Sequence, residues 1–262
     1  MKLGGLQKLT LLDYPGRIAC IVFTEGCNFR CPYCHNAGLV LPEQMTEPES
    51  EASVLSYLEK RRQILEGVVI TGGEPLLQPD LELFLQKIHR LGYPVKLDTN
   101  GSFPERLDAL LKNGLIHYAA LDVKHAPAQY GKASGIRSGK TVSLVEQSIH
   151  SLLCSGISFE FRTTVVKGIH TAEVLTELGF WLARMTTEAS GPEKQMPPWF
   201  LQTYVDSGHV IAPEGLSPFS EREMEDLLMV AETAYGATAL RGGSPNRSEN
   251  RTAVCAAAEN RK

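Results

Sequence analysis

The hydrophobic positions of this chain alternate between short apolar runs and longer segments with a helical period. The apolar runs are typical of strands that are covered on both faces. They are predicted at 17–23, 68–70, 94–97, 118–123, 158–166 and 199–204. The longer segments repeat apolar residues every three or four positions, as helices do. They are predicted at 46–66, 79–91, 104–113, 141–155, 171–185 and from 220 to the glycine at 236.

Six strand–helix alternations imply right-handed βαβ units around a parallel sheet, either open or closed into a barrel. A full barrel needs eight such units. The predicted fold is therefore α/β: a partial (β/α)6 TIM-like barrel of parallel strands with outer helices.

The two ends of the chain differ from this repeat. Residues 1–16 are expected to form a lead-in segment that ends in a turn at the sequence Asp-Tyr-Pro-Gly. A short last strand is expected at 237–240, which closes a single domain over residues 1–241. The tail at 242–262 is polar or alanine-rich without periodicity, and we expect it to be disordered.

Composition narrows the class of protein. The chain has 262 residues, of which 43% are hydrophobic, and a net charge of -4. So mild an acidity argues against nucleic acid or an anionic membrane as the main partner. The sequence has no apolar run near the length of a membrane span and no signal-peptide pattern at its start. We therefore expect a cytoplasmic protein, in which clustered cysteines usually indicate a metal or catalysis.

Three cysteines follow the first predicted strand at the spacing C-x3-C-x2-C: Cys27, Cys31 and Cys34. They are too close together, and odd in number, to pair as disulfides. A short loop can instead turn three thiolates toward one point, as a metal or an iron–sulfur cluster requires. A zinc site with His35 as fourth ligand would need adjacent residues to converge on one tetrahedral ion. A cluster with one iron free of protein ligands is the favoured interpretation.

Three more polar clusters, at 71–75, 98–101 and 122–125, lie at the ends of predicted strands. Parallel α/β folds gather their chemistry at these ends, so we expect one shared site. In the 71–75 cluster, glycines let backbone approach a ligand closely. Glu74 has two possible roles, since it can accept from an ammonium or turn inward to fix the loop. A plain strand–helix turn would explain the glycines but not the glutamate.

The cysteine loop, with the aromatic residue Tyr33 before its last cysteine, resembles that of the radical S-adenosylmethionine superfamily. The Gly-Gly-Glu-Pro sequence at 72–75 strengthens the resemblance. It implies that the three cysteines hold a [4Fe–4S] cluster whose fourth iron binds the amino and carboxylate groups of S-adenosylmethionine. It also implies cofactor contacts from Tyr33, Gly72, Gly73 and Glu74.

Within that superfamily, the sequences around Asp98, Asp122, Lys124 and Arg162 match strand ends of glycyl-radical activating enzymes. The resemblance implies that Lys124 binds the methionyl carboxylate, and that Asp98 and Asp122 bind a hydroxyl or a monovalent cation. Taken alone, an Asp-x-Lys sequence is usually a solvated ion pair. Arg162 could equally be a surface or barrel-rim residue without a role in binding.

On the sixth strand, some activating enzymes carry a histidine that approaches the cofactor. This chain has none there, so Gln202 or Tyr204 substitutes or the contact is absent. His35 and Asn36 are expected to support the cysteine loop rather than to bind the cluster.

The sequences at 4–8 and 13–16, running into 24–36, are similar to a group described as anaerobic ribonucleoside-triphosphate reductase activating proteins. This implies an oxidoreductase whose cluster is reduced by a flavodoxin or ferredoxin and cleaves S-adenosylmethionine to methionine and a 5′-deoxyadenosyl radical. The radical removes a hydrogen atom from the Cα of one glycine of a partner, which is a glycyl-radical enzyme. A partly open barrel suits the entry of a protein loop.

Three alternatives stay open. One is a radical S-adenosylmethionine enzyme that acts on a small molecule or peptide. Peptide modifiers usually carry further cysteines for auxiliary clusters, whereas Cys20, Cys154 and Cys255 read as two buried hydrophobes and a tail thiol. Another is an electron-transfer iron–sulfur protein, in which Glu74 and Lys124 would have no role. The third is a zinc-stabilised binding protein.

Overall fold

The structure is a computed structural model that describes residues 1–41, 48–190, 195–206, 208 and 210–241. The predicted disordered tail at 242–262 lies outside the described residues. No helix in the described ranges is both long and apolar enough to cross a membrane.

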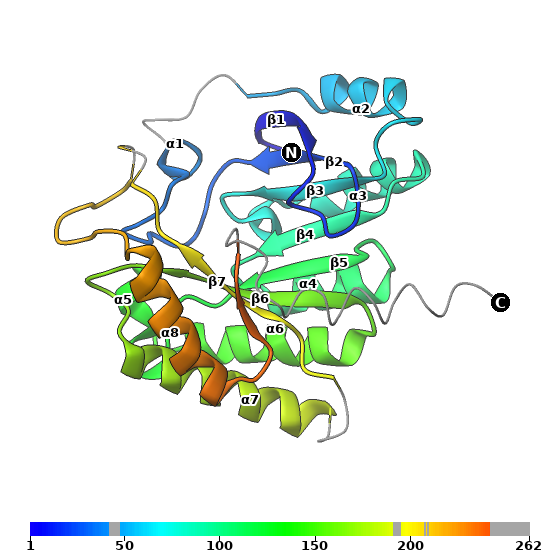
Figure 1. The fold of residues 1–262 in the computed structure, drawn as a ribbon. Coiled ribbons are helices and arrows are strands. Elements are labelled where there is room, and N and C mark those ends of the chain that lie inside the picture. The colour runs from blue at the N-terminus through cyan, green and yellow to red at the C-terminus, as the bar shows by residue number, and fades with distance from the viewer. Residues whose placement is uncertain (42–47, 191–194, 207, 209, 242–262) are drawn as a thin grey trace.

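The described residues form one sheet of eight strands, which lie side by side in the order of the sequence (Figure 1). The strands are β1 (Leu3–Thr10), β2 (Ala19–Thr24), β3 (Gly67–Gly72), β4 (Val95–Thr99), β5 (Tyr118–Asp122), β6 (Ser158–Val165), β7 (Trp199–Thr203) and β8 (Thr238–Leu240). Neighbours from β2 to β8 are parallel, and β1 is antiparallel to β2. The sheet is open, with β1 and β8 at its edges.

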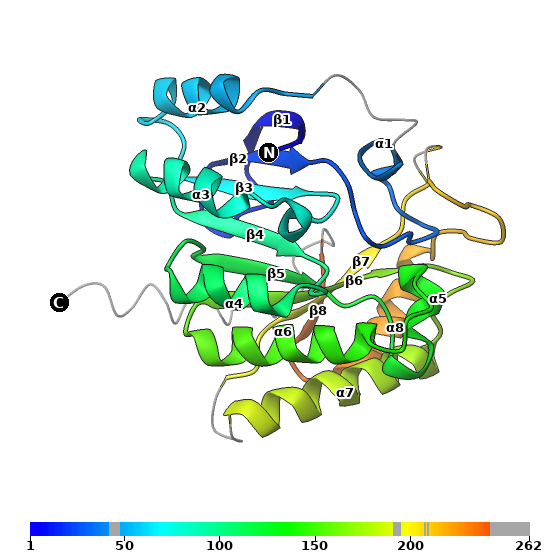
Figure 2. The ribbon, with the colours of Figure 1, turned by 180° about the vertical axis from the view of Figure 1, so that it is seen from behind.

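Helices cover the outer face of the curved sheet (Figure 2). The described helices are α1 (Ala37–Val40), α2 (Glu51–Lys60), α3 (Leu81–Arg90), α4 (Pro104–Lys112), α5 (Tyr130–Ser134), α6 (Thr141–Ser155), α7 (Ala172–Ser190) and α8 (Glu221–Ala234). This arrangement confirms the predicted α/β fold, a partial TIM-like barrel with outer helices.

Two predicted elements differ from the structure. The lead-in contains a strand, β1, before its turn, and the half-exposed sequence LGGLQKLT gives no apolar run that would reveal it. The helix predicted at 46–66 starts on residues 46–47, which lie outside the described residues. Within the described part, the helix runs from Glu51 to Lys60, and the Ser50 side chain caps its start by accepting from the backbone N–H of Ser53. The division into one domain at 1–241 stays a prediction.

The two faces of the sheet carry different side chains. On β4, Val95 and Leu97 pack into the main core between sheet and helices, whereas Lys96 and Asp98 alternate with them. The same alternation on β6 sends Glu160 and neighbouring polar residues away from that core. The inner face of the barrel therefore holds charged groups.

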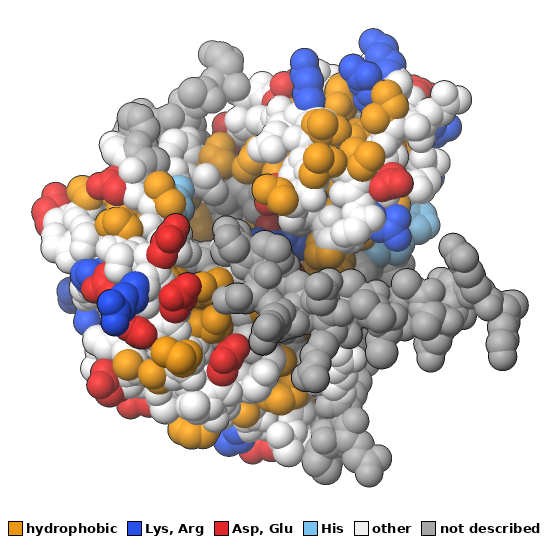
Figure 3. Space-filling model, in the orientation of Figure 1, with side chains coloured by type: hydrophobic (Ala, Val, Ile, Leu, Met, Phe, Trp, Pro, Cys, Tyr) orange, Lys and Arg blue, Asp and Glu red, His pale blue; other side chains and the backbone are white. Residues whose placement is uncertain are grey.

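Exposed hydrophobic side chains gather over the N-terminal strands (Figure 3). Large apolar residues of this region with more than half of their surface exposed are Leu9, Leu11 and Leu12. They belong to β1 and the turn before β2, at the opposite end of β2 from the cysteine loop. None of these three leucines lines the cavity described below.

Candidate functional site

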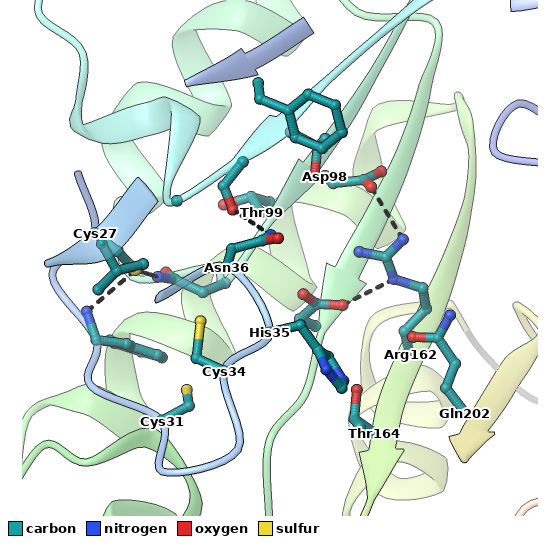
Figure 4. A pocket seen from close by; sticks show the side chains of 18 of the residues that line it. Cys27, Cys31, Cys34, His35, Asn36, Asp98, Thr99, Arg162, Thr164 and Gln202 are labelled. Carbon is teal, nitrogen blue, oxygen red and sulfur yellow. Dashed lines mark hydrogen bonds and ion pairs between the residues drawn. The ribbon is translucent and has the colours of Figure 1, made fainter. Parts of the chain in front are cut away.

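A cavity of about 460 Å³ opens where the carboxyl ends of the parallel strands meet the cysteine loop (Figure 4). Its lining includes all of the predicted site residues except Glu74: Cys27, Cys31, Tyr33, Cys34, Gly72, Gly73, Asp98, Asp122, Lys124 and Arg162. The structure therefore brings together side chains that are spread over more than half of the sequence.

The cysteine loop is closed by its own arginine. The Arg30 guanidinium donates to the carbonyl oxygens of Cys27, at 2.6 Å, and of Phe29, at 2.8 Å. The backbone N–H of Phe29 donates to the Cys27 Sγ at 3.3 Å, and that of Cys34 donates to the Cys31 carbonyl at 3.0 Å. These contacts fix the turn from which the three sulfur atoms project.

Distant segments hold the loop in place. The N–H of Gly26 donates to the carbonyl of Leu39, and the N–H of Arg30 donates to that of Ser134. The Pro32 carbonyl accepts from Ala212 at 2.9 Å. The loop is thus tied to α1, to α5 and to the segment that follows β7, which makes a rigid support for a metal group.

The chemistry of the three thiols fits a cluster. Burial raises the pKa of Cys27 to about 11 and that of Cys31 to about 12, and it also raises the pKa of Cys34. All three are free and face one cavity, so a bound cluster would displace their protons. Among the described residues, no three His, Cys, Asp or Glu side chains are arranged around a single metal ion.

The glycine turn after β3 packs directly on the cysteine loop. A Cβ on Gly72, whose φ is +117°, would lie 2.4 Å from the backbone of Thr24. A Cβ on Gly73 would lie 2.0 Å from the carbonyl oxygen of Gly26. The N–H of Gly73 donates to the Thr24 carbonyl at 2.9 Å, and the N–H of Glu74 donates to that of Gly26 at 2.8 Å. Glycine is needed here because two backbones meet.

Glu74 takes the second of its two possible roles, since its carboxylate is fully buried and turned inward. It accepts from the Leu76 N–H at 3.0 Å, the Thr99 hydroxyl at 2.8 Å and the Asn100 N–H at 2.7 Å. Burial raises the pKa of Glu74 to about 7. The side chain joins the ends of β3 and β4 and does not line the cavity.

Asparagines that the sequence analysis did not single out connect the cysteine loop to the end of β4. The Asn100 side-chain amide donates to the Asn28 side-chain oxygen at 3.0 Å, and the Asn28 amide donates to the Ser102 hydroxyl at 2.8 Å. Asn28 lies in the cysteine loop, and Asn100 lies in the polar cluster at 98–101. The sequence pattern gave no indication that these two residues, 72 positions apart, form a hydrogen bond.

The carboxylates and cations at the strand ends form one chain of ion pairs. Arg162 donates through Nε to Asp122 at 2.8 Å and through Nη1 to Asp98 at 3.0 Å (Figure 4). Lys124 donates to the other Asp122 oxygen at 3.1 Å. Burial opposes ionisation of Asp122, but the charges of Arg162 and Lys124 outweigh it and hold the pKa of Asp122 below its usual value. The lower pKa of Asp98 has the same origin, with Arg162 and Lys96 as the nearby cations.

The residues after the last cysteine support the loop. The His35 ring stacks on Tyr204, with centroids 5.4 Å apart, and the Asn36 amide donates to the Gly72 carbonyl at 3.2 Å. Gln202 lines the cavity, as does Thr164, which lies two residues beyond Arg162 on β6. Of the two substitutes considered, Gln202 on β7 therefore faces the site, and Tyr204, directly after β7, stacks on His35.

Comparison with known families gives a match over residues 21–178 to the model of the radical SAM superfamily. The match covers the cysteine loop and all strand ends from β2 to β6, and so it includes nearly the whole cavity.

Two curated relatives carry different activities in their names. A protein of Methanocaldococcus jannaschii, designated a candidate glycyl-radical enzyme activating enzyme, is 38% identical over 122 residues, which are 46% of this chain and 49% of that protein. The GTP 3′,8-cyclase of Nautilia profundicola is 30% identical over 166 residues, 60% of this chain and 50% of that enzyme. The chain thus spans about half the length of the curated relatives it matches.

Among solved structures, a similar fold occurs in Streptococcus suis SuiB bound to its precursor peptide SuiA. The TM-score is 0.61 at 15% identity, and the match covers 85% of this chain and 48% of that chain. At this identity the likeness concerns the fold alone.

Replacing any one of Cys27, Cys31 and Cys34 with alanine should abolish loading of the cluster. Each thiolate would bind a different iron, so the loss of one leaves an incomplete cage. Iron and sulfide analysis after anaerobic reconstitution should show about four irons per chain in the wild type and a small fraction of that in each variant. Cys154 is exposed on α6 rather than buried as the sequence suggested, and Cys154→Ala is the matched control. Stoichiometric zinc without iron in the wild type would contradict the prediction.

Gly73→Ala should destabilise the fold, because its methyl group would meet the Gly26 carbonyl at 2.0 Å. The overpacking should lower the free energy of unfolding of the metal-free protein by about 1–3 kcal/mol in denaturant titrations. Gly5→Ala in β1 is the control, since nothing lies within 4 Å of its added Cβ. Equal stabilities for the two variants would show that the turn does not press on the cysteine loop.

Glu74 should make the stability of the metal-free protein depend on pH. Its pKa is raised to about 7, so the folded state holds this proton more tightly than the unfolded state. Its contribution is present below the unfolded pKa, near 4.3, and is lost as pH rises toward 7, at no more than about 1.4 kcal/mol per pH unit. Urea titrations from pH 5 to 7.5 should give a smaller decline in Glu74→Gln. The exposed control Glu59→Gln should follow the wild type, and parallel curves for all three proteins would contradict this account.

Proposed function

The chain belongs to the radical SAM superfamily, and we propose that it is an activating enzyme for a glycyl-radical enzyme. Proteins of this superfamily bind a [4Fe–4S] cluster and S-adenosylmethionine, which are the cofactors of this chain. The proposal is supported by the relative at 38% identity and by the charges of the cavity, which are considered below.

The cluster would be held by Cys27, Cys31 and Cys34, whose thiols project from one anchored loop. When bound and reduced, the cluster and S-adenosylmethionine together supply a 5′-deoxyadenosyl radical that removes a hydrogen atom from the substrate. The chain itself places the cofactor and keeps water from the radical. The inner wall that Tyr33 and Phe29 line is apolar and buried, which suits the second task.

S-adenosylmethionine would lie between the cysteine loop and the chain of ion pairs. Lys124 would bind its carboxylate, and Arg162 would hold Asp98 and Asp122 toward its hydroxyl groups. The carbonyls of the turn at Gly72 and Gly73 can accept from its ammonium group. Glu74 is left out of this set, because its carboxylate is already satisfied by three donors.

The charge of the cavity favours a neutral substrate, and this observation carries the proposal. Its described lining contains three carboxylates, of Asp13, Asp98 and Asp122, and two basic groups, Lys124 and Arg162. Both basic groups are already ion-paired with these carboxylates. With Lys124 also engaged by the carboxylate of S-adenosylmethionine and Arg162 by two carboxylates, the described lining has no further lysine or arginine for a triphosphate. A glycine in a protein loop carries no charge to neutralise.

Anaerobic ribonucleoside-triphosphate reductase is the partner we propose first, because the sequences at 4–8, 13–16 and 24–36 resemble its activating proteins. Another glycyl-radical enzyme is the next choice. A flavodoxin or ferredoxin would deliver the electron, and the cytoplasm is the proposed compartment, since it keeps the cysteine thiols reduced.

A second candidate is cyclisation of GTP, which the relative at 30% identity over 60% of the chain brings into consideration. It would require the triphosphate to enter a cavity whose two basic groups are neutralised. The ion pairs of Arg162 and Lys124 therefore favour the activating enzyme.

Anaerobically reconstituted protein, given a reductant and S-adenosylmethionine, should release 5′-deoxyadenosine. Addition of a glycyl-radical reductase should produce the doublet of a glycyl radical in EPR spectra, because the radical is transferred to a backbone Cα. The matched control is the same reductase with its radical-bearing glycine replaced by alanine, which should give 5′-deoxyadenosine without the doublet.

The alternatives give different results in the same assay. Consumption of GTP with no doublet from any glycyl-radical enzyme would exclude the activating role and leave the superfamily assignment intact. A reducible cluster without cleavage of S-adenosylmethionine would indicate electron transfer instead.

A further inference from the structure

A lysine lies fully buried on the inner face of the barrel, next to the proposed cofactor site. The Lys96 ammonium is 2.9 Å from the Asp98 Oδ1 and 3.9 Å from the Glu160 Oε1. It also lies 5.9 Å from the centroid of the Tyr118 ring. Its side chain has no exposed surface. The sequence analysis did not single out this residue.

The surroundings of this ammonium are those of a small monovalent cation. Two carboxylate oxygens and the face of an aromatic ring attract a compact positive charge, and the interior makes that attraction strong. A buried ammonium without such partners would be very costly. The lysine side chain places its positive charge between Asp98 and Glu160, where a bound ion could otherwise lie.

The expected site for an exchangeable monovalent cation does not fit the structure. Each carboxylate oxygen of Asp98 and Asp122 already has a basic partner: Lys96 and Arg162 for Asp98, Arg162 and Lys124 for Asp122. Every one of these partners belongs to the chain itself. The negative charge of these two carboxylates is thus already compensated by basic groups of the chain, and no further cation is needed to neutralise it.

Removal of the Lys96 side chain would leave an empty space between Asp98 and Glu160. Asp98 would keep Arg162, and Glu160 would keep Arg241 and the Tyr118 hydroxyl, which donates at 3.0 Å. The charge between the two carboxylates would be lost, and the space of a side chain would open between their oxygens. A small cation has both the room and the attraction to enter there.

We propose that Lys96 is a built-in monovalent cation, whose ammonium holds Asp98 in place beside the cofactor and makes the enzyme independent of potassium, sodium or ammonium ions. Lys96 is in this sense a positioning residue, since it acts through Asp98. The inference rests on the proposed placement of S-adenosylmethionine beside Asp98. Its first test uses the protein without substrate, so a failure there differs from a failure of the proposed function.

The first experiment measures thermal unfolding of the cluster-loaded protein in chloride salts of tetramethylammonium, ammonium and potassium at equal ionic strength. The wild type should unfold at the same temperature in all three. Lys96→Ala should unfold at a lower temperature in tetramethylammonium, which is too large for the space, and recover in ammonium or potassium, because a bound cation stabilises the folded state. Lys96→Met keeps an apolar stem in the space, so it should fold without such a response.

The second experiment measures binding and cleavage of S-adenosylmethionine in the same salts. Lys96→Ala should bind S-adenosylmethionine at least about tenfold more weakly in tetramethylammonium, with recovery as ammonium is added. Lys112→Ala is the control, since this lysine is exposed and pairs with Asp108 on α4. It should match the wild type throughout.

Two results would overturn the proposal. A wild type that needs potassium or ammonium for stability or for binding of S-adenosylmethionine would show that an exchangeable ion acts at this site. A folded Lys96→Ala or Lys96→Met that binds S-adenosylmethionine as the wild type does, in tetramethylammonium, would show that the ammonium positions nothing. If neither variant folds, the wild type alone decides by its response to the three salts.

Discussion

The contact between two backbones, the glycine turn after β3 and the start of the cysteine loop, is the constraint on which the site depends. The Gly72 and Gly73 positions touch Thr24 and Gly26 so closely that no Cβ fits between them. This contact continues the pairing of β2 with β3 beyond the strand ends. It therefore fixes the three cysteines relative to the wall of the cavity by backbone geometry, which side-chain rotation does not alter.

The other wall of the cavity is held by charge. On the inner faces of β4, β5 and β6, carboxylates alternate with lysine and arginine so that each buried charge meets an opposite one. Such pairs contribute little net stability, because desolvation offsets their attraction. What they provide is direction: the planar guanidinium of Arg162 sets two carboxylates at fixed angles.

The sequence predicted well the features that depend on local pattern. Strands β2 to β7 were found because both of their faces are buried, whereas β1 was missed because it is half-exposed and contains two glycines. The polar clusters at the ends of predicted strands predicted the shared site, yet the direction of Glu74 depends on the Thr99 hydroxyl, which β4 brings from 25 residues away. Lys96 lies in a strand predicted from its apolar residues. Its role could not be predicted from the sequence, because Glu160 comes next to it only through the pairing of strands in the sheet.

Lys124 joins the two walls. Its ammonium pairs with Asp122 on the charged side, and its positive charge lowers the pKa of the Cys31 thiol against the larger effect of burial. The His170 ring bonds the Lys124 carbonyl at 2.9 Å, so the backbone of this residue is held as firmly as its side chain. A group that pairs with Asp122 and also favours thiolate at the cysteines must lie between the charged wall and the cysteine loop. The structure places one lysine there, at the end of β5, where the parallel sheet brings both walls within its reach.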